Sequence, residues 1–171
     1  MTDREIMEYD VIIVGAGPAG LSCAIRLKQR KPELMIAVIE KASEIGAHIL
    51  SGAVIEPQPL DDLLPGWRED PPPVCIPVEK DEIWLLSQKG RRRLPTPPQQ
   101  KNHGNFIVSL GAMCAWMANQ AEALEIDIFP GFAAAEIRYT DEGAVGGVVI
   151  GDMGIGRDGA PKDTYMQGIE I

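Results

Sequence analysis

The segment Tyr9–Leu27 constrains the fold of this chain more than any other, because it joins a short hydrophobic run to a glycine-rich turn and a helical pattern. A buried strand is expected at Val11–Val14. The helix after the turn is expected to bury Leu21, Ala24 and Ile25 on one face. The turn has the spacing G-x-G-x-x-G, at Gly15, Gly17 and Gly20. This succession is typical of a dinucleotide-binding unit.

Each glycine of this turn has a physical reason. The first permits the tight turn, the second lets the backbone approach a pyrophosphate, and the third lets helix and strand pack closely. Pro18 stands at or near the first helical position, where its missing N–H costs nothing. The free N–H groups of the helix N-terminus then point at the phosphates. A turn without a ligand is the competing interpretation.

The second strand supplies the context that three glycines alone do not. It is expected at Met35–Ile39 and is followed directly by Glu40. The fingerprint places an acid on a ribose hydroxyl about 20 residues after the last glycine. The sequence therefore predicts a dinucleotide site.

Composition narrows the class of protein. The chain has 171 residues, enough for one domain with a real core, and a net charge of -9 that argues against a nucleic-acid partner. The N-terminus is acidic and has neither a signal-peptide nor a transit-peptide pattern, and no apolar run approaches the roughly 18 residues of a membrane span. A cytosolic or peripheral protein is expected.

The cysteines and histidines predict neither disulfides nor a metal site. Cys23, Cys75 and Cys114 are widely spaced, which suggests buried free thiols in a reducing compartment. The only histidines are His48 and His103, so no metal-ligand cluster is visible.

The remaining patterns predict an α/β fold with antiparallel insertions. Parallel strands are expected from Val11, Met35 and Ile126, and Met113, Met117, Ala121 and Leu124 are expected to form the core face of a helix over 110–124. Two hairpins are expected after it, with turns at residues 141–143 and 158–159. The proline-rich stretch Pro57–Pro77 is expected to be irregular and extended rather than helical. Because the sheet lacks further parallel strands, the sequence is interpreted as an N-terminal fragment.

Two segments have open interpretations. Gly46, Ser51, Gly52 and Ala53 follow the second strand and form either an ordinary loop or a second strip of cofactor contact. The segment Ile83–Pro98 combines Trp84 and leucines with a cationic patch. That patch is either a solvated hairpin tip around Gly90 or a surface that rests on a membrane. Its cations are Lys89, Arg91, Arg92 and Arg93.

Beyond these patterns, the chain resembles the electron-transfer flavoprotein–ubiquinone oxidoreductase family. The segments that carry the resemblance are VIIVGAGPAGLSCAIRL, GAHILSGAV, NHGN, the run from QAEAL to FPGFAAAE, and GDMGIGRDGAPK. The resemblance implies a Rossmann-like FAD-binding domain of the glutathione-reductase type. It further implies electron transfer from reduced electron-transfer flavoprotein through FAD and a 4Fe-4S cluster to ubiquinone, with an inserted quinone- and membrane-facing segment at about residues 57–105.

The resemblance assigns cofactor roles but no catalytic residue, because the flavin carries the redox chemistry. The pyrophosphate would lie along Gly15, Gly17, Pro18, Ala19 and Gly20. Glu40, followed by Lys41, would bind the adenosine ribose. The rest of FAD would lie along Gly46, Ser51, Gly52 and Ala53. Ala134 would lie against the adenine. A peripheral position on the cytoplasmic face of a bacterial inner membrane is implied.

Two departures from the family pattern leave alternatives open. Glu125 stands where the family usually has a glycine, so the preceding helix must end without one. None of the three cysteines matches the cluster ligands, so the chain by itself is expected to bind no cluster. The alternatives are an FAD-dependent geranylgeranyl (isoprenoid) reductase and a truncated, non-catalytic chain.

Overall fold

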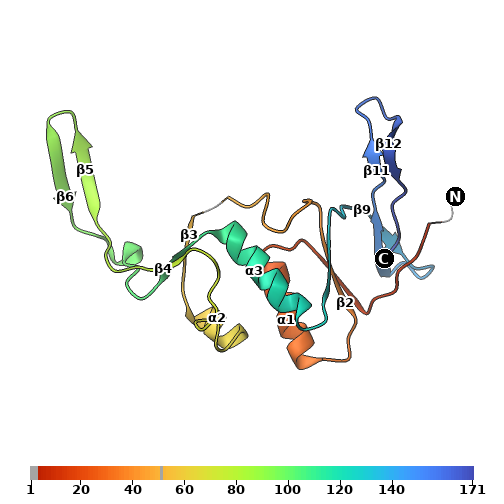
Figure 1. The fold of residues 1–171 in the computed structure, drawn as a ribbon, viewed down its shortest axis with the longest axis horizontal. Coiled ribbons are helices and arrows are strands. Elements are labelled where there is room, and N and C mark those ends of the chain that lie inside the picture. Colours follow the sequence, from red (N-terminus) through yellow and green to blue (C-terminus); the bar gives the residue numbers. More distant parts are fainter. Residues whose placement is uncertain (1–3, 51) are drawn as a thin grey trace. The chain divides into compact units, whose positions relative to one another are not determined.

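The computed structural model describes residues 4–50 and 52–171. The chain divides into two units, one formed by residues 1–49 and 114–171 and the other by residues 50–113 (Figure 1). The segment predicted as an insertion, residues 57–105, falls inside the second unit.

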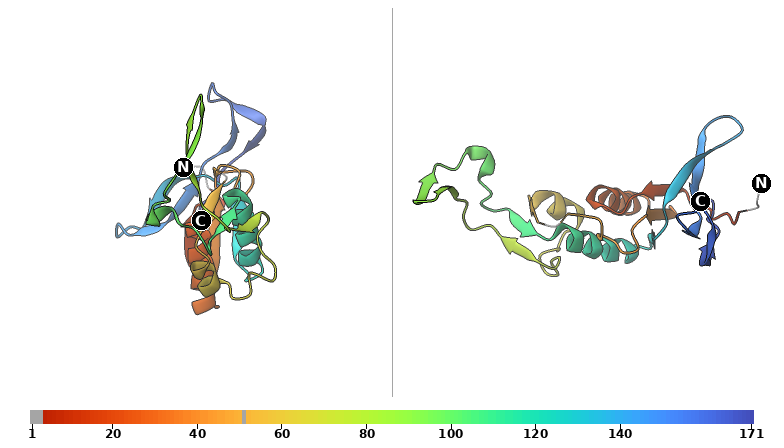
Figure 2. Two further views of the ribbon diagram at one scale, coloured as in Figure 1. Left: turned by 90° about the vertical axis from the view of Figure 1, so that its left-hand side faces the viewer. Right: turned by 90° about the horizontal axis from the view of Figure 1, so that it is seen from above.

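The first unit contains a three-stranded parallel sheet. Its strands are β1 (Val11–Val14), β2 (Ile36–Glu40) and β8 (Asp127–Pro130), in the order β1-β2-β8. Helix α1 (Pro18–Arg30) connects β1 to β2 and packs on both (Figure 2). Helix α3 (Leu110–Glu122) starts at the end of the second unit and leads into β8. The three predicted parallel strands are confirmed.

The core of this unit follows the predicted pattern. Ile36–Ile39 are all buried, as expected for the central strand of a parallel sheet, which is covered on both faces. Helix α1 buries Leu21, Ala24 and Ile25, and α3 buries Met117 and Ala121. Leu124, expected on the same face, is only half-buried.

Two antiparallel hairpins follow β8. The first pairs β9 (Ala134–Tyr139) with β10 (Val145–Ile150), and the second pairs β11 (Met153–Ile155) with β12 (Pro161–Met166). Residues 169–171 form a further ladder beside β10, where Ile171 N donates to Val148 O at 2.9 Å. Ile171 is buried in a cluster with Ile39 and Ile150, so this end of the chain packs against the parallel sheet's central strand.

The second unit has its own small core. Strands β3 (Ala53–Ile55), β7 (Phe106–Val108) and β4 (Cys75–Pro77) form an antiparallel sheet in that order, and β5 (Ile83–Ser87) pairs with β6 (Gly90–Leu94) as a hairpin. A 3₁₀ turn follows at Pro98–Gln100. The ring of Trp67 is buried edge-on against Phe106, with 5.3 Å between centroids.

The expectation that Pro57–Pro77 contains no helix is wrong. Helix α2 (Gln58–Leu63) begins there with Pro57 as its N-cap and Pro59 in its first turn. Proline is tolerated in the first turn because the N–H groups there have no intrahelical acceptor. Leu60 and Leu63 are buried, so packing of two leucines outweighs the extended bias of the surrounding prolines.

Helix α3 ends on a left-handed glutamate. Glu125 has φ +61°, Glu125 N donates to Glu122 O, and Ile126 N donates to Ala121 O at 3.2 Å. This is the Schellman pattern, which normally places glycine at the left-handed position. The helix therefore closes with the usual hydrogen bonds, and Glu125 bears the steric cost that glycine avoids.

We expect Glu125→Gly to raise the free energy of unfolding by about 1 kcal/mol, since it removes the left-handed strain at an exposed position. Equilibrium urea unfolding measures the change. Glu125→Ala is the matched control, because it removes the carboxylate but keeps Cβ. An equal gain in the alanine variant would show that the charge, and not the backbone, is the cause.

Candidate functional site

The glycine turn adopts the geometry that a phosphate-binding turn requires. Gly15 has φ +101°, and its N–H donates to Ile39 O at 2.7 Å, which fixes the end of β1 against β2. Gly17 is the N-cap of α1 and Pro18 is its first residue. A Cβ placed on Gly17 would meet no heavy atom within 4 Å, so open space lies in front of the helix N-terminus.

Gly20 serves packing rather than space for a ligand. A Cβ at this position would lie 2.0 Å from Gly15 O and 3.3 Å from Ile13 Cγ2. No rotation of a side chain can relieve a contact with a backbone oxygen. The third glycine is therefore required for α1 to approach β1.

Glu40 joins the ends of β1 and β2. Its Oε2 accepts a hydrogen bond from Ala16 N at 3.0 Å, and its Oε1 accepts one from Ala42 N at 2.9 Å. Each carboxylate oxygen can accept a further hydrogen bond, so the group can hold the turn and still receive ribose hydroxyls. Gly131 N in turn donates to Ala42 O at 2.7 Å, which ties the turn after β8 to the same region.

A pocket of about 200 Å³ opens at the carboxyl ends of the three parallel strands. Ligands of open parallel α/β sheets bind in the crevice at these ends. Gly15, Glu40, Lys41 and Ala134, all predicted as cofactor residues, line this pocket. The other lining residues are Val14, Ile39, Phe132 and Ala133.

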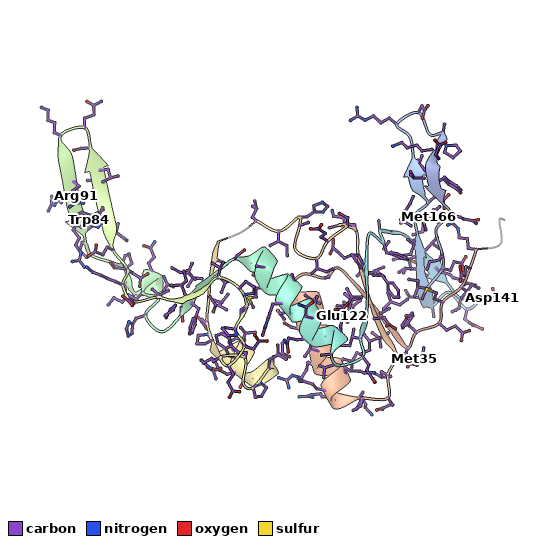
Figure 3. All side chains as sticks on the ribbon, viewed as in Figure 1. Met35, Trp84, Arg91, Glu122, Asp141 and Met166 are labelled. Carbon is purple, nitrogen blue, oxygen red and sulfur yellow. The ribbon has the colours of Figure 1, made fainter. Side chains whose placement is uncertain are left out.

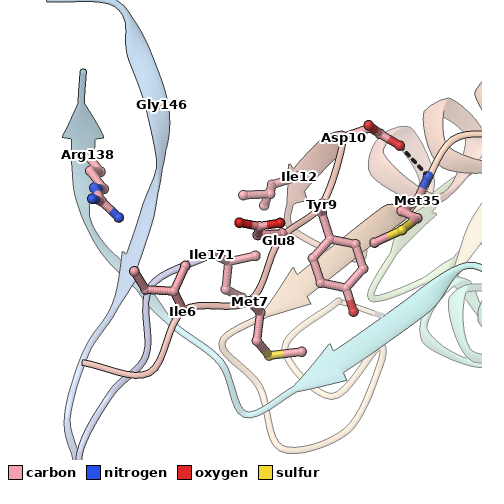
Figure 4. Close-up of a pocket in the computed structure, with 10 residues that line it drawn as sticks. All are labelled: Ile6, Met7, Glu8, Tyr9, Asp10, Ile12, Met35, Arg138, Gly146 and Ile171. Carbon is pink, nitrogen blue, oxygen red and sulfur yellow. Dashed lines mark hydrogen bonds between the residues drawn. The ribbon is translucent and has the colours of Figure 1, made fainter. Parts of the chain in front are cut away.

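A larger cavity of the first unit lies at the opposite end of the strands. It has about 500 Å³ and includes Asp10 and Met35, which immediately precede β1 and β2 (Figure 4). Asp10 Oδ2 accepts a hydrogen bond from Met35 N at 2.8 Å there. Because the phosphate-binding turn is at the carboxyl ends, this cavity is not the candidate cofactor site.

The predicted second strip of cofactor residues is divided between the two units. Gly46, with φ +87°, belongs to the first unit, whereas Gly52 and Ala53 belong to the second. Ser51 lies outside the described residues. The cofactor role of these four residues stays a prediction.

The cysteines differ in environment. Cys114 of α3 is buried; burial, and then the nearby charge of Glu40, raise the pKa of its thiol to about 11. Cys23 is exposed, so the expectation that all three thiols are buried is wrong. On α1, Cys23 stands between the buried residues Leu21 and Ala24 in the sequence. Its side chain therefore projects from a different face of the helix, away from the sheet.

Sequence reasoning did not identify Phe132 and Ala133 as pocket residues, nor Ala16 and Ala42 as partners of Glu40. Phe132 and Ala133 carry no motif, but they follow the third parallel strand, where a crevice at the carboxyl ends was to be expected. Ala16 and Ala42 act through backbone N–H groups, which no residue type reveals.

Comparison with solved structures defines the class of the fold. The chain shares a TM-score of 0.55 with CtdE in complex with FAD, at 22% identity over 84% of this chain and 34% of that protein. Residues 2–57 match the model of the Thi4 family. With the parallel sheet and its glycine turn, these matches establish a Rossmann-like fold.

Comparison with curated sequences narrows the class further. The chain is 48% identical over 98% of its length to the mitochondrial electron transfer flavoprotein-ubiquinone oxidoreductase of Oryza sativa subsp. japonica, and spans 30% of that protein. It is 50% identical over 99% of its length to the electron transfer flavoprotein-ubiquinone oxidoreductase of Pseudomonas aeruginosa, and spans 32% of it. The predicted resemblance to these oxidoreductases is confirmed, over about a third of their length.

Proposed function

We propose that the pocket at the carboxyl ends of β1, β2 and β8 binds the adenosine diphosphate half of FAD. The observation that carries the proposal is the open space before Gly17 beside the carboxylate of Glu40. The pyrophosphate would rest on the N-terminus of α1, where the first N–H groups lack intrahelical acceptors and the helix dipole favours an anion. The carboxylate of Glu40 would accept hydrogen bonds from the ribose hydroxyls, and Ala134 would lie next to the adenine.

The whole-protein activity that we propose is oxidation of reduced electron-transfer flavoprotein and reduction of ubiquinone. The names of the two relatives support it. FAD, when bound, supplies the electron-transfer chemistry. The residues of this chain bind and orient its nucleotide half, and none is proposed as a nucleophile or proton donor.

A 4Fe-4S cluster does not fit the residues of this chain. Such clusters are held by four cysteine thiolates, whereas the chain has three cysteines, of which Cys114 is buried in α3 and Cys23 is exposed on α1. Within residues 4–50 and 52–171, no three His, Cys, Asp or Glu side chains are grouped to hold a metal ion. We assign no step to a cluster.

Electron transfer in the protein purified from its own cells tests this proposal. The protein is expected to contain FAD, to oxidise reduced electron-transfer flavoprotein and to reduce a soluble ubiquinone. A flavoprotein that leaves the quinone unchanged but saturates isoprenoid double bonds would indicate the reductase alternative. A protein without flavin would contradict the proposal altogether.

We also propose that the β5–β6 hairpin rests on a membrane surface. The described helices include none long and apolar enough to cross a bilayer. In the hairpin, Trp84, Leu85 and Leu86 on β5 are exposed, and Arg91 guanidinium lies 4.9 Å from the centroid of the Trp84 ring (Figure 3). Neighbouring strands are about 4.8 Å apart. If the edge of the hairpin faces the membrane, β6 with its arginines would lie at the depth of the lipid phosphates, and β5 with its apolar side chains would lie slightly deeper.

We expect Arg91→Gln with Arg92→Gln to lower affinity for vesicles containing phosphatidylglycerol by about 30-fold, since each cation near an anionic surface contributes about 1 kcal/mol. Vesicle flotation at low and high salt measures the change. Arg26→Gln with Arg30→Gln, on α1, is the charge-matched control. Equal binding by both double variants would contradict a role for the hairpin.

A further inference from the structure

A polar cavity of about 470 Å³ lies at the base of the β5–β6 hairpin, within the second unit. Ligand pockets for small molecules commonly have about 300–1,000 Å³. The side chains that give this cavity its charge come from the segment before β5, from the end of β6 and from the loop before β7. They are Glu79, Lys80, Asp81, Arg93 and Lys101, and His103 also lines the cavity.

Asp81 holds in place the loop that carries Lys101 and His103. Asp81 Oδ2 accepts a hydrogen bond from Asn102 N at 2.8 Å, and its Oδ1 accepts one from Asn102 Nδ2 at 2.9 Å. Thr96 Oγ1 donates to Asp81 O at 3.3 Å. The two Asn102 donors, and then nearby His103, lower the pKa of Asp81, and among the described residues Asp81 forms no ion pair.

Some charged side chains of the cavity form ion pairs with Glu82, and others form none. Lys80 Nζ lies 2.6 Å from Glu82 Oε1, and Arg93 Nη1 lies 3.3 Å from the same oxygen. Among the described residues, Lys101 and Glu79 form no ion pair. The cavity thus presents cationic and anionic groups in near balance, which disfavours a ligand that carries only one sign of charge.

We propose that this cavity binds the phosphoethanolamine headgroup of a bilayer lipid, with Arg93 and Lys101 on the phosphate and with Glu79 and Asp81 on the ammonium. The inference rests on the proposed membrane contact of the hairpin, because Arg93 belongs to β6, the strand assigned to phosphate depth. A primary ammonium donates hydrogen bonds to carboxylates, whereas the quaternary ammonium of phosphocholine has no N–H to donate.

The test separates headgroup recognition from general attraction to anionic lipid. The whole chain is bound to vesicles of fixed phosphatidylglycerol content in which phosphatidylcholine is replaced by phosphatidylethanolamine, at constant net charge. We expect binding to rise about threefold with phosphatidylethanolamine, the scale of a partly exposed ion pair. Glu79→Gln should abolish this rise and keep the dependence on phosphatidylglycerol. Glu69→Gln, an exposed acid outside the cavity, is the matched control.

Two outcomes would overturn the inference: no rise with phosphatidylethanolamine, or a rise that persists in Glu79→Gln and so reflects lipid packing. If the chain binds no vesicle, the proposed membrane contact fails. Soluble glycerophosphoethanolamine then tests the cavity alone, through NMR shifts of the Glu79 and Lys101 amides. Shifts with this probe but not with glycerophosphocholine would support the headgroup site, and equal or absent shifts would contradict it.

Discussion

Gly20→Ala is expected to lower the free energy of unfolding by about 3 kcal/mol or more, at the upper end of what overpacking costs. The new Cβ would lie 2.0 Å from Gly15 O. That oxygen cannot withdraw easily, because Gly15 N is hydrogen-bonded to Ile39 O at 2.7 Å and fixes the turn on the sheet. Either α1 must move away from β1, or the turn must break. Denaturant unfolding followed by circular dichroism measures the loss.

Gly17→Ala is the control for this experiment. Gly17 has φ -78°, which alanine adopts without strain, and its Cβ would meet no atom within 4 Å. Its stability should therefore match that of the unmodified chain. If Gly20→Ala and Gly17→Ala unfold at the same denaturant concentration, the packing role of Gly20 is wrong.

Glu40→Gln is expected to weaken FAD binding about 100-fold, or about 3 kcal/mol, the scale of one or two hydrogen bonds to a charged group. The amide retains a single acceptor oxygen, so its NH₂ must face the N–H of either Ala16 or Ala42, both of which now donate to the carboxylate. The turn loses one of its two hydrogen bonds to the side chain of residue 40, and the ribose hydroxyls lose a charged acceptor. Flavin fluorescence during titration measures the dissociation constant.

Glu44→Gln is the matched control for Glu40, because Glu44 is an exposed acid a short distance along the chain that does not line the candidate FAD pocket. Its affinity for FAD should equal that of the unmodified chain. If Glu40→Gln also binds FAD unchanged, the nucleotide lies elsewhere than beside β2.

The sequence could predict the parallel sheet because its signals are local and agree with each other. Hydrophobic periodicity located β1, α1 and β2, and the spacing from Gly20 to Glu40 follows from the length of one β-α-β unit. The turn glycines are detectable for the same reason, since a backbone with positive φ or a close contact leaves few residue types that fit.

What the sequence could not predict depends on contacts between distant segments. Helix α2 forms because Leu60 and Leu63 become buried, and its prolines favoured the wrong expectation. The hydrogen bonds of Glu40 to Ala16 and Ala42 involve backbone donors that any residue except proline provides. The cavity at the base of the hairpin needs Asp81 and Asn102 to meet, although 21 positions separate them.

Titration of FAD into the unmodified chain and into Gly17→Ala tests whether the pocket at the glycine turn binds the nucleotide. Gly17→Ala keeps the fold but places a methyl group in the space where the backbone must approach the pyrophosphate. We expect saturable, equimolar binding by the unmodified chain and a large loss of affinity in the variant at equal stability. Equal binding by both, or no binding by the folded unmodified chain, would contradict the assignment of this pocket to FAD.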